Sequence, residues 1–194
     1  MVAGAYLLGS VSFAVVVSWL FELPDPHTYG SRNPGATNVL RTGRKLAAAL
    51  TLAGDALKGF AAVAIVGWLA PRVGAASWAP AAAGAAVFIG HLFPVFHHFA
   101  GGKGVSTAAG IVFAWHWPLG VALSVVWLLV AFGFRMSSLA ALTTAVLLPL
   151  GMFYVAGPAS AQAWVSVAIA LLLFWRHRTN IRQLLAGSER QIGR

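Results

Sequence analysis

A turn rich in glycine interrupts an otherwise apolar part of the chain, HHFAGGKGVSTAAG at residues 97–110. Glycines let consecutive backbone N–H groups converge on an anion without steric cost. Lys103 adds a point charge, and a helix that begins near Gly104 would add the positive end of its dipole. These features predict a phosphate-like ligand, although a tight turn with one lysine has the same composition. The motif is not a Walker A loop, because His97 and Gly104 stand where that loop needs a glycine and a Ser or Thr.

A second polar segment, GSRNPGATNVLRTG, covers residues 30–43. Hydroxyl and amide side chains, exposed backbone amides and an arginine fork together suit phosphate oxygens. A connecting loop with helix-capping Thr and Asn residues would have a similar composition, so both interpretations stay open. The candidate binding residues are Ser31, Asn33, Gly35, Thr37, Asn38 and Arg41.

The third polar segment is WRHRTNIRQLLAGSER, residues 175–190. If this segment is helical, His177 and Asn180 share one face at a spacing of i, i+3. Its arginines are also typical of a basic helix that rests on anionic lipid, which is the better interpretation for the arginines alone.

Two charged residues lie inside an apolar run, in AGDALKGF. An isolated charge at such a place costs about 2.5–3.5 kcal/mol on membrane-insertion scales, so Asp55 and Lys58 are expected to neutralise each other or face a cavity. A structural pair and an orienting pair are equally open interpretations. His91 precedes the glycine turn, which makes it a further candidate for a supporting role.

The composition is that of an integral membrane protein. The 194 residues are 59% hydrophobic and 9% charged, whereas a soluble domain carries about 25% charged residues. We assign the net charge of +9 to basic residues held on the cytoplasmic side and to a site for an anionic substrate, and expect no nucleic acid partner. The absence of cysteine excludes disulfides and thiolate catalysis, and four carboxylates with six histidines do not predict a metal site.

Long apolar runs predict the membrane spans. A single helix over residues 105–134 would be about 45 Å long, against a hydrocarbon core of about 30 Å, so we expect two helices broken at HWP, residues 116–118. The helix after Lys103, of roughly 12 residues, is too short to cross, so the glycine turn is expected to dip into the membrane and line a cavity. The other expected spans cover about 2–21, 47–70, 79–96, 137–157 and 159–175.

The distribution of positive charge predicts the orientation. If residues 105–134 form a hairpin, eleven of the thirteen Lys and Arg residues lie on one side of the membrane. The positive-inside rule favours this arrangement. We therefore predict an all-α integral membrane protein, one domain over residues 1–194, with seven transmembrane helices, some short or broken. The N-terminus would lie outside and the C-terminus in the cytoplasm.

The three polar segments, in this order, resemble the acyl-phosphate:glycerol-3-phosphate acyltransferases of bacterial membranes (the PlsY family). Arg32 stands where that family usually has glycine, and Ser12 where proline is common, so Arg32 would alter the loop or add a phosphate contact. The resemblance runs from residue 6 to residue 189 and rests on YLLGSVSF, GSRNPGATNVLRTGRK, GDALKGF, GHLFPVFHHFAGGKGVSTAAG and WRHRTNIRQLLAGSE.

The resemblance implies a reaction. A fatty acyl group would pass from acyl phosphate to the 1-hydroxyl of glycerol 3-phosphate, giving lysophosphatidic acid and phosphate in the first acylation of phospholipid biosynthesis. It implies a multi-pass protein of the bacterial inner membrane with its site toward the cytoplasm. No cofactor and no acyl-CoA are expected.

The resemblance also implies roles for the polar residues. Because the mixed anhydride is already activated, the protein needs to supply mainly proximity and charge stabilisation. The hydroxyl proton would go to His177 or to a substrate phosphate, and we favour the phosphate because no carboxylate in the sequence is placed to orient the histidine. Ser31, Thr37, Asn38 and the amides of Gly101, Gly102 and Gly104 are assigned to phosphate and oxyanion charge, and Arg41, Lys103, His177 and Asn180 to anchoring glycerol 3-phosphate and phosphoryl oxygens.

Two other classes of function compete with this one. A transporter for a phosphorylated solute would use the broken span as half of a binding site, but the polar segments gather on one side and no inverted repeat is evident. A lipid-binding scaffold would need only basic residues, whereas Ser31, Asn38 and Asn180 are uncharged donors.

Overall fold

The computed structural model describes residues 1–192, which form helices and no strand. The expected all-helical architecture is therefore confirmed. The longer helices are α4 (Lys45–Leu69), α5 (Ala79–Leu92), α7 (Trp117–Phe134), α8 (Ser137–Ala156) and α9 (Ala161–Arg176). The shorter ones are α1 (Val2–Gly9), α2 (Phe13–Leu20), α3 (Ala36–Leu40), α6 (Val105–Trp115) and α10 (Arg178–Leu185), with 3-10 turns at Ala70–Val73 and Val95–His97.

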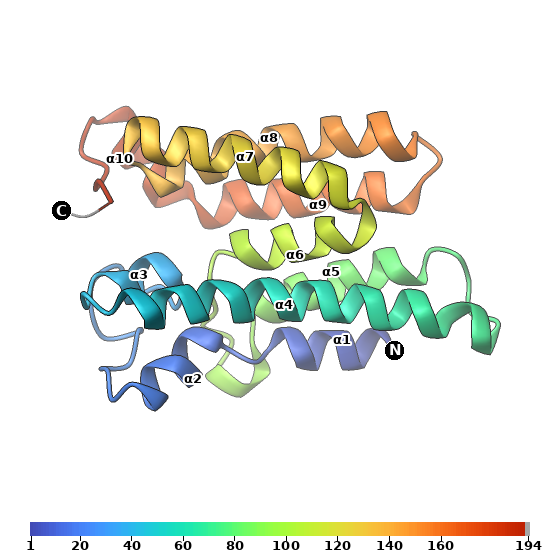
Figure 1. Cartoon of the computed structure of the whole chain (residues 1–194), viewed down its shortest axis with the longest axis horizontal. Coiled ribbons are helices and arrows are strands. Elements are labelled where there is room, and N and C mark those ends of the chain that lie inside the picture. Colours follow the sequence, from blue (N-terminus) through green and yellow to red (C-terminus); the bar gives the residue numbers. More distant parts are fainter. Residues whose placement is uncertain (193–194) are drawn as a thin grey trace.

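The helices lie in two groups along the long axis of the molecule (Figure 1). One group contains α1, α2, α4 and α5, the other contains α7, α8 and α9, and α6 lies between them. The turns that carry α3 and α10 lie at one end, and the turn between α4 and α5 lies at the other. This arrangement brings segments from distant parts of the sequence to a single end of the bundle.

Four helical segments are long and apolar enough to cross a membrane: Lys45–Val73, Ala79–His97, Trp117–Phe134 and Ser137–Ala156. The number rises to five if α1 and α2 count as one broken span. The expectation of one continuous helix over residues 2–21 is wrong, because the chain bends by 43° between α1 and α2. At the break the Ser10 hydroxyl donates to Tyr6 O and accepts from the N–H of Val95, which draws the backbone out of regular helix.

The predicted break within residues 105–134 is confirmed. α6 has 11 residues and ends at Trp115, and His116 is extended with φ −156°. α7 then starts at Trp117 with a proline in its first turn, and His116 Nδ1 accepts from the N–H of Leu119. In Figure 1, α6 and α7 run in opposite directions, so the two form a hairpin.

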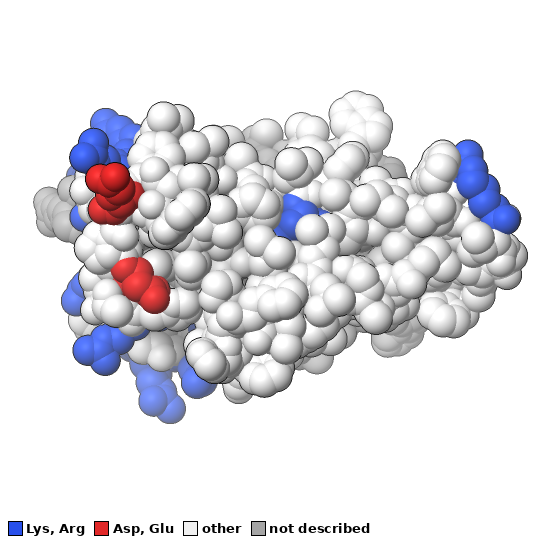
Figure 2. Space-filling model, turned by 90° about the horizontal axis from the view of Figure 1, so that it is seen from below, with Lys and Arg blue, Asp and Glu red and all other residues white. Residues whose placement is uncertain are grey.

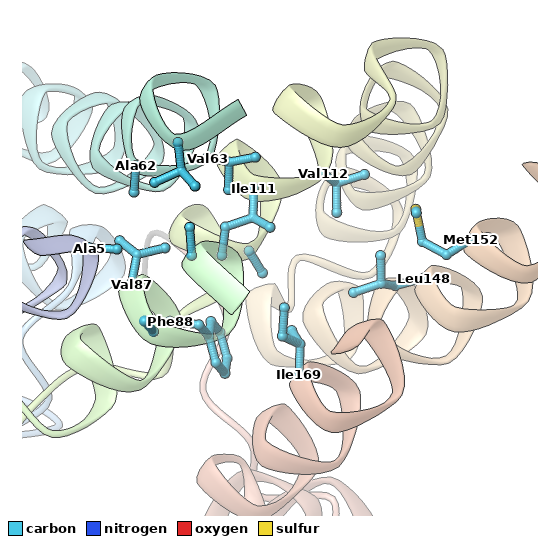
Figure 3. Packing of buried hydrophobic residues seen from close by; sticks show 14 of the residues in the cluster. Ala5, Ala62, Val63, Val87, Phe88, Ile111, Val112, Leu148, Met152 and Ile169 are labelled. Carbon is cyan, nitrogen blue, oxygen red and sulfur yellow. The ribbon is translucent and has the colours of Figure 1, made fainter. Parts of the chain in front are cut away.

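Small residues allow α4 and α6 to approach closely. A Cβ at Gly110 would lie 1.9 Å from the carbonyl oxygen of Ala56, and one at Gly59 would lie 2.3 Å from that of Thr107. Close contact of this kind stabilises helix pairs in a membrane, where apolar burial drives association only weakly. Around this contact, Val87, Phe88, Ile111, Leu148 and Ile169 point from four helices into a shared apolar interior (Figure 3). The packing fixes the start of α6, and with it the glycine turn.

Candidate active site

The three polar segments of the sequence meet in one cleft of about 460 Å³. Most charged side chains gather at one end of the molecule (Figure 2), and α3 and α10 lie at this end in Figure 1. The fold brings the three segments together in a single cleft, which their order along the chain could not reveal. Of the candidate residues, the cleft is lined by Ser31, Asn33, Arg41, Gly101, Lys103 and Asn180.

Lys103 is the central cation of the cleft. Its Nζ donates to Asn180 Oδ1 at 2.5 Å, so the turn and α10 are joined directly. Burial lowers the pKa of Lys103 to about 8; the negative charge of Glu189 opposes this shift, and the positive charge of Arg176 adds to it. A bound anion would therefore find a lysine with few competing counter-charges.

Glu189 was not singled out by sequence reasoning, and it organises one wall of the cleft. Its Oε1 accepts from Asn180 Nδ2 and from the Ser138 hydroxyl, both at 2.7 Å. The Asn180 amide thus bridges Lys103 on one side and Glu189 on the other. The only available signal was composition, since Glu189 is one of four acidic residues and stands within a basic segment.

His177 lies beneath the cleft rather than on its lining. It stands between two helices, because α9 ends at Arg176 and α10 begins at Arg178. His177 Nδ1 lies 2.8 Å from Leu173 O, which can only accept, so Nδ1 carries the proton and Nε2 is the acceptor. Burial, with the nearby charge of Lys103, lowers the pKa of His177 to about 4. The imidazole is therefore neutral at physiological pH.

Asn38 holds residues 30–43 in shape. Its Oδ1 accepts from the N–H of Ser31 at 2.9 Å, from the Ser31 hydroxyl at 3.1 Å and from Arg41 Nη1 at 3.1 Å. Its Nδ2 donates to Pro26 O at 2.9 Å. Asn38 itself is buried, so it orients Ser31 and Arg41 toward the cleft instead of facing it.

Three other residues of this segment differ in position. Gly35 caps the start of α3 and Thr37 is exposed on that helix, and neither lines the cleft. Arg32, the residue that departs from the family pattern, does line it. Its φ of 55° lies in the left-handed region that favours glycine, so an arginine at this position carries backbone strain.

The glycine turn packs tightly against the end of α5. Gly102 donates its N–H to His91 O at 3.2 Å, and a Cβ at Gly102 would lie 2.3 Å from His91 Nε2. Gly104 has φ 89° and precedes α6. Neither lines the cleft, whereas Gly101 does, and the N–H of Gly101 donates to no protein group within residues 1–192. Arg176 Nη2 donates to Gly101 O, so this arginine contacts the turn rather than lipid.

Asp55, Lys58 and His91 form a separate buried cluster. Asp55 Oδ1 lies 3.0 Å from Lys58 Nζ and 3.5 Å from His91 Nδ1. The two charges thus neutralise each other, one of the two expected outcomes. Within residues 1–192, no group of three His, Cys, Asp or Glu residues is placed to hold a metal ion.

Known proteins share the sequence of this chain over most of its length. The glycerol-3-phosphate acyltransferase family model matches residues 1–187. The chain belongs to this family. It is 57% identical to a glycerol-3-phosphate acyltransferase of Burkholderia ambifaria and to one of Burkholderia multivorans, each over 190 residues that cover 97% of this chain and 88% of the relative. The protein is therefore an acyltransferase, as the resemblance of its motifs indicated.

Solved structures support the same conclusion. Two crystal structures of PlsY, an integral membrane glycerol 3-phosphate acyltransferase, are each 38% identical to the chain and cover 99% of it. The glycerol 3-phosphate form has a TM-score of 0.90 and is covered to 94%, and the lysophosphatidic acid form has a TM-score of 0.88 and is covered to 93%. The fold of an integral membrane acyltransferase is thus shared across the whole chain.

Proposed function

We propose that this acyltransferase transfers a fatty acyl group from acyl phosphate to the 1-hydroxyl of glycerol 3-phosphate, giving lysophosphatidic acid and phosphate. The observation that carries the proposal is the cleft, where Arg41, Lys103 and Arg176 line the wall and Glu189 is the one carboxylate among the lining residues of 1–192. Such a site suits two phosphate-bearing substrates. Relatives solved in glycerol 3-phosphate and lysophosphatidic acid forms support the acceptor and the product.

The chemistry needs no covalent intermediate on the protein. The glycerol oxygen attacks the acyl carbon, the bond from that carbon to the phosphate oxygen breaks, and phosphate leaves with the electron pair. Lys103 and Arg41 would hold phosphoryl oxygens, with the N–H of Gly101 beside them, while Asn180 orients Lys103. The Ser31 hydroxyl would join them by turning its one proton from Asn38 Oδ1 to a phosphoryl oxygen. Positioning and charge stabilisation of this kind supply most of the acceleration in such reactions.

The hydroxyl proton is assigned to a phosphate oxygen of the substrate. A general base works best when its pKa lies near the operating pH. His177, with a pKa of about 4, is poorly matched to this task, whereas the second pKa of a phosphate monoester is about 6. His177 would then act by supporting the wall of the cleft beside Lys103 and Asn180.

The first test uses purified protein with palmitoyl phosphate and glycerol 3-phosphate, without metal or CoA. We expect release of phosphate and lysophosphatidic acid in equal amounts, each dependent on both substrates. Palmitoyl-CoA in place of palmitoyl phosphate is expected to give no product. Folded protein that acylates only from palmitoyl-CoA would contradict the donor, and folded protein inactive with both would contradict the proposed reaction.

The acyl chain of the donor is assigned to an apolar groove of about 650 Å³ formed by α2, α4 and α6. The exposed residue Ala53 lines this groove, and a tryptophan there would displace about two methylenes, which costs about 1.6 kcal/mol or about tenfold in affinity. We expect Ala53→Trp to lower kcat/KM for palmitoyl phosphate by about tenfold and to spare butyryl phosphate. Ala49→Trp, exposed one turn away on α4 and outside the groove, is the matched control. An equal loss with both donors would contradict the assignment.

The remaining proposals concern topology. We propose one domain over residues 1–194 in the bacterial inner membrane, with seven spans, the N-terminus outside, and the C-terminus and cleft in the cytoplasm. The hairpin of α6 and α7 and the gathering of basic residues at the end with α10 support it (Figures 1 and 2). Because the chain lacks cysteine, Ser77→Cys and Ser188→Cys can each be labelled alone. A membrane-impermeant maleimide should label only Ser77→Cys in intact spheroplasts, and the reverse result would invert the orientation.

A further inference from the structure

The buried cluster of Asp55, Lys58 and His91 lies outside the cleft, and the reaction described above uses none of its atoms. The Asp55 and Lys58 side chains are only 2% and 1% exposed. Buried ion pairs are costly compared with apolar residues of the same volume, so their presence alone does not account for stability. The contacts that these residues make outside the cluster indicate which parts of the chain they hold in place.

One side of the cluster reaches the break in the first span. Lys58 Nζ donates to Val11 O at 2.6 Å, in the segment between α1 and α2. A carbonyl freed by a helix break within a membrane must find a partner inside the protein. Lys58 therefore stabilises the bend, and the Ser10 hydroxyl and Tyr6 Oη, which bond the backbones of Val95 and Phe93, join the same region to the chain that leads into the glycine turn.

The other side of the cluster reaches the glycine turn itself. His91 Nδ1 faces Asp55, and the opposite edge of its ring faces Gly102, where a Cβ would lie 2.3 Å from Nε2 and 2.9 Å from Cε1. The backbone carbonyl of His91 accepts from the N–H of Gly102. One residue thus contacts the turn through both its ring and its backbone, one position before Lys103.

We propose that Asp55, Lys58 and His91 are positioning residues, which tie the glycine turn to the broken first span and so fix Lys103 and the N–H of Gly101 where they meet a substrate phosphate. In this arrangement Asp55 sets the orientation of the His91 ring, and the ring sets the position of the glycine turn relative to the cleft. The inference rests on the phosphate-binding role proposed for the turn.

The test separates positioning from folding by a split between KM and kcat. His91→Asn keeps a nitrogen near Asp55 and removes the ring edge that faces Gly102. We expect it to raise KM for glycerol 3-phosphate by about 10- to 100-fold, the size of effect that a misplacement of about 1 Å can produce, with a smaller change in kcat. Thr51→Val is the control: Thr51 is a buried residue on α4, the helix of Asp55 and Lys58, and its hydroxyl donates to Ala47 O and to no other group within residues 1–192. It should leave both constants and the melting temperature unchanged.

A double-mutant cycle tests the contact itself. Gly102→Ala places its Cβ 2.3 Å from the His91 ring and 2.8 Å from Pro34 O. In the double variant with His91→Ala the closer of these two contacts is absent. We expect the increase of KM in the double variant to be well below the product of the increases in the two single variants. In the control double variant, Gly102→Ala with Thr51→Val, the two effects on KM should multiply. If His91→Ala does not fold, His91→Asn takes its place in the cycle. Unchanged KM in the His91 variants, or effects that multiply, would overturn the inference.

Lys103→Ala distinguishes failure of this inference from failure of the function on which it rests. If Lys103→Ala raises KM for glycerol 3-phosphate and the His91 variants do not, the turn binds phosphate without help from the cluster. If Lys103→Ala leaves KM and kcat unchanged, the proposed role of the turn fails, and the inference fails with it.

Discussion

Replacement of Lys103 by alanine is expected to lower kcat/KM for glycerol 3-phosphate by about 100- to 1000-fold, the usual loss when one preorganised charge donor is removed. Lys103 is held by Asn180, and burial lowers its pKa, so its charge is poorly solvated before substrate binds. A phosphate replaces the missing solvation, and the interaction is correspondingly strong. Steady-state assays with both substrates varied, together with melting curves that show an intact fold, provide the measurement.

The pH dependence of the same constant offers a second view of Lys103. Because folding lowers the pKa of this lysine from 10.5 to about 8, its charge is lost as the pH rises through 8. Since kcat/KM reports groups of the free enzyme, it should fall above about pH 8. His177 is neutral above about pH 5, so its protonation should not lower kcat/KM between pH 5 and pH 8. Lys103→Arg cannot lose its proton in this range and should remove the alkaline limb, so a limb that persists in this variant would assign it to another group.

Much of the site could be predicted because its chemistry is local in the sequence. The glycine turn, residues 30–43 and the segment after α9 each carry a dense run of donors, and donors beside apolar spans indicate an anion site. The short α6 followed from the break before Pro118. The hydropathy pattern and the distribution of positive charge between the two sides of the membrane could not, however, show which donors face the cleft.

The features that sequence reasoning missed depend on tertiary contacts. The first span bends at Ser10 because its hydroxyl finds a partner at Val95, 85 residues away. Asn38 carries the residue type of a ligand, but its amide oxygen and nitrogen bond groups within residues 26–41 of the chain. The sequence indicated that Arg176 faces lipid, whereas in the structure it donates a hydrogen bond to Gly101 O. For Ser10 and Arg176 the residue type was informative, but the partner lies far away in the sequence. For Asn38 the partners are near in the sequence, and only the fold shows that they occupy the side chain.

Glu189→Ala is expected to lower kcat/KM by about 100-fold and to lower the melting temperature in detergent. Oε1 of Glu189 is the acceptor for both Asn180 and Ser138. Without it each donor is left unsatisfied, at a cost of about 1–3 kcal/mol for a buried group. Asn180 would then be free to turn away from Lys103, and the cleft would lose the one carboxylate that residues 1–192 place among its cations.

Two further variants separate the causes of this loss. Glu189→Gln keeps an oxygen acceptor and removes the charge, so it should retain the melting temperature better than Glu189→Ala does. Glu22→Ala removes an exposed acid outside the cleft and is the matched control, with no change expected. If Glu189→Gln equals wild type in turnover and stability, the hydrogen bonds to Asn180 and Ser138 account for the role of Glu189. If it is as inactive as Glu189→Ala but fully stable, the negative charge itself holds Lys103 in place. A Glu189→Ala variant with wild-type kinetics would show that the cleft wall does not need this carboxylate.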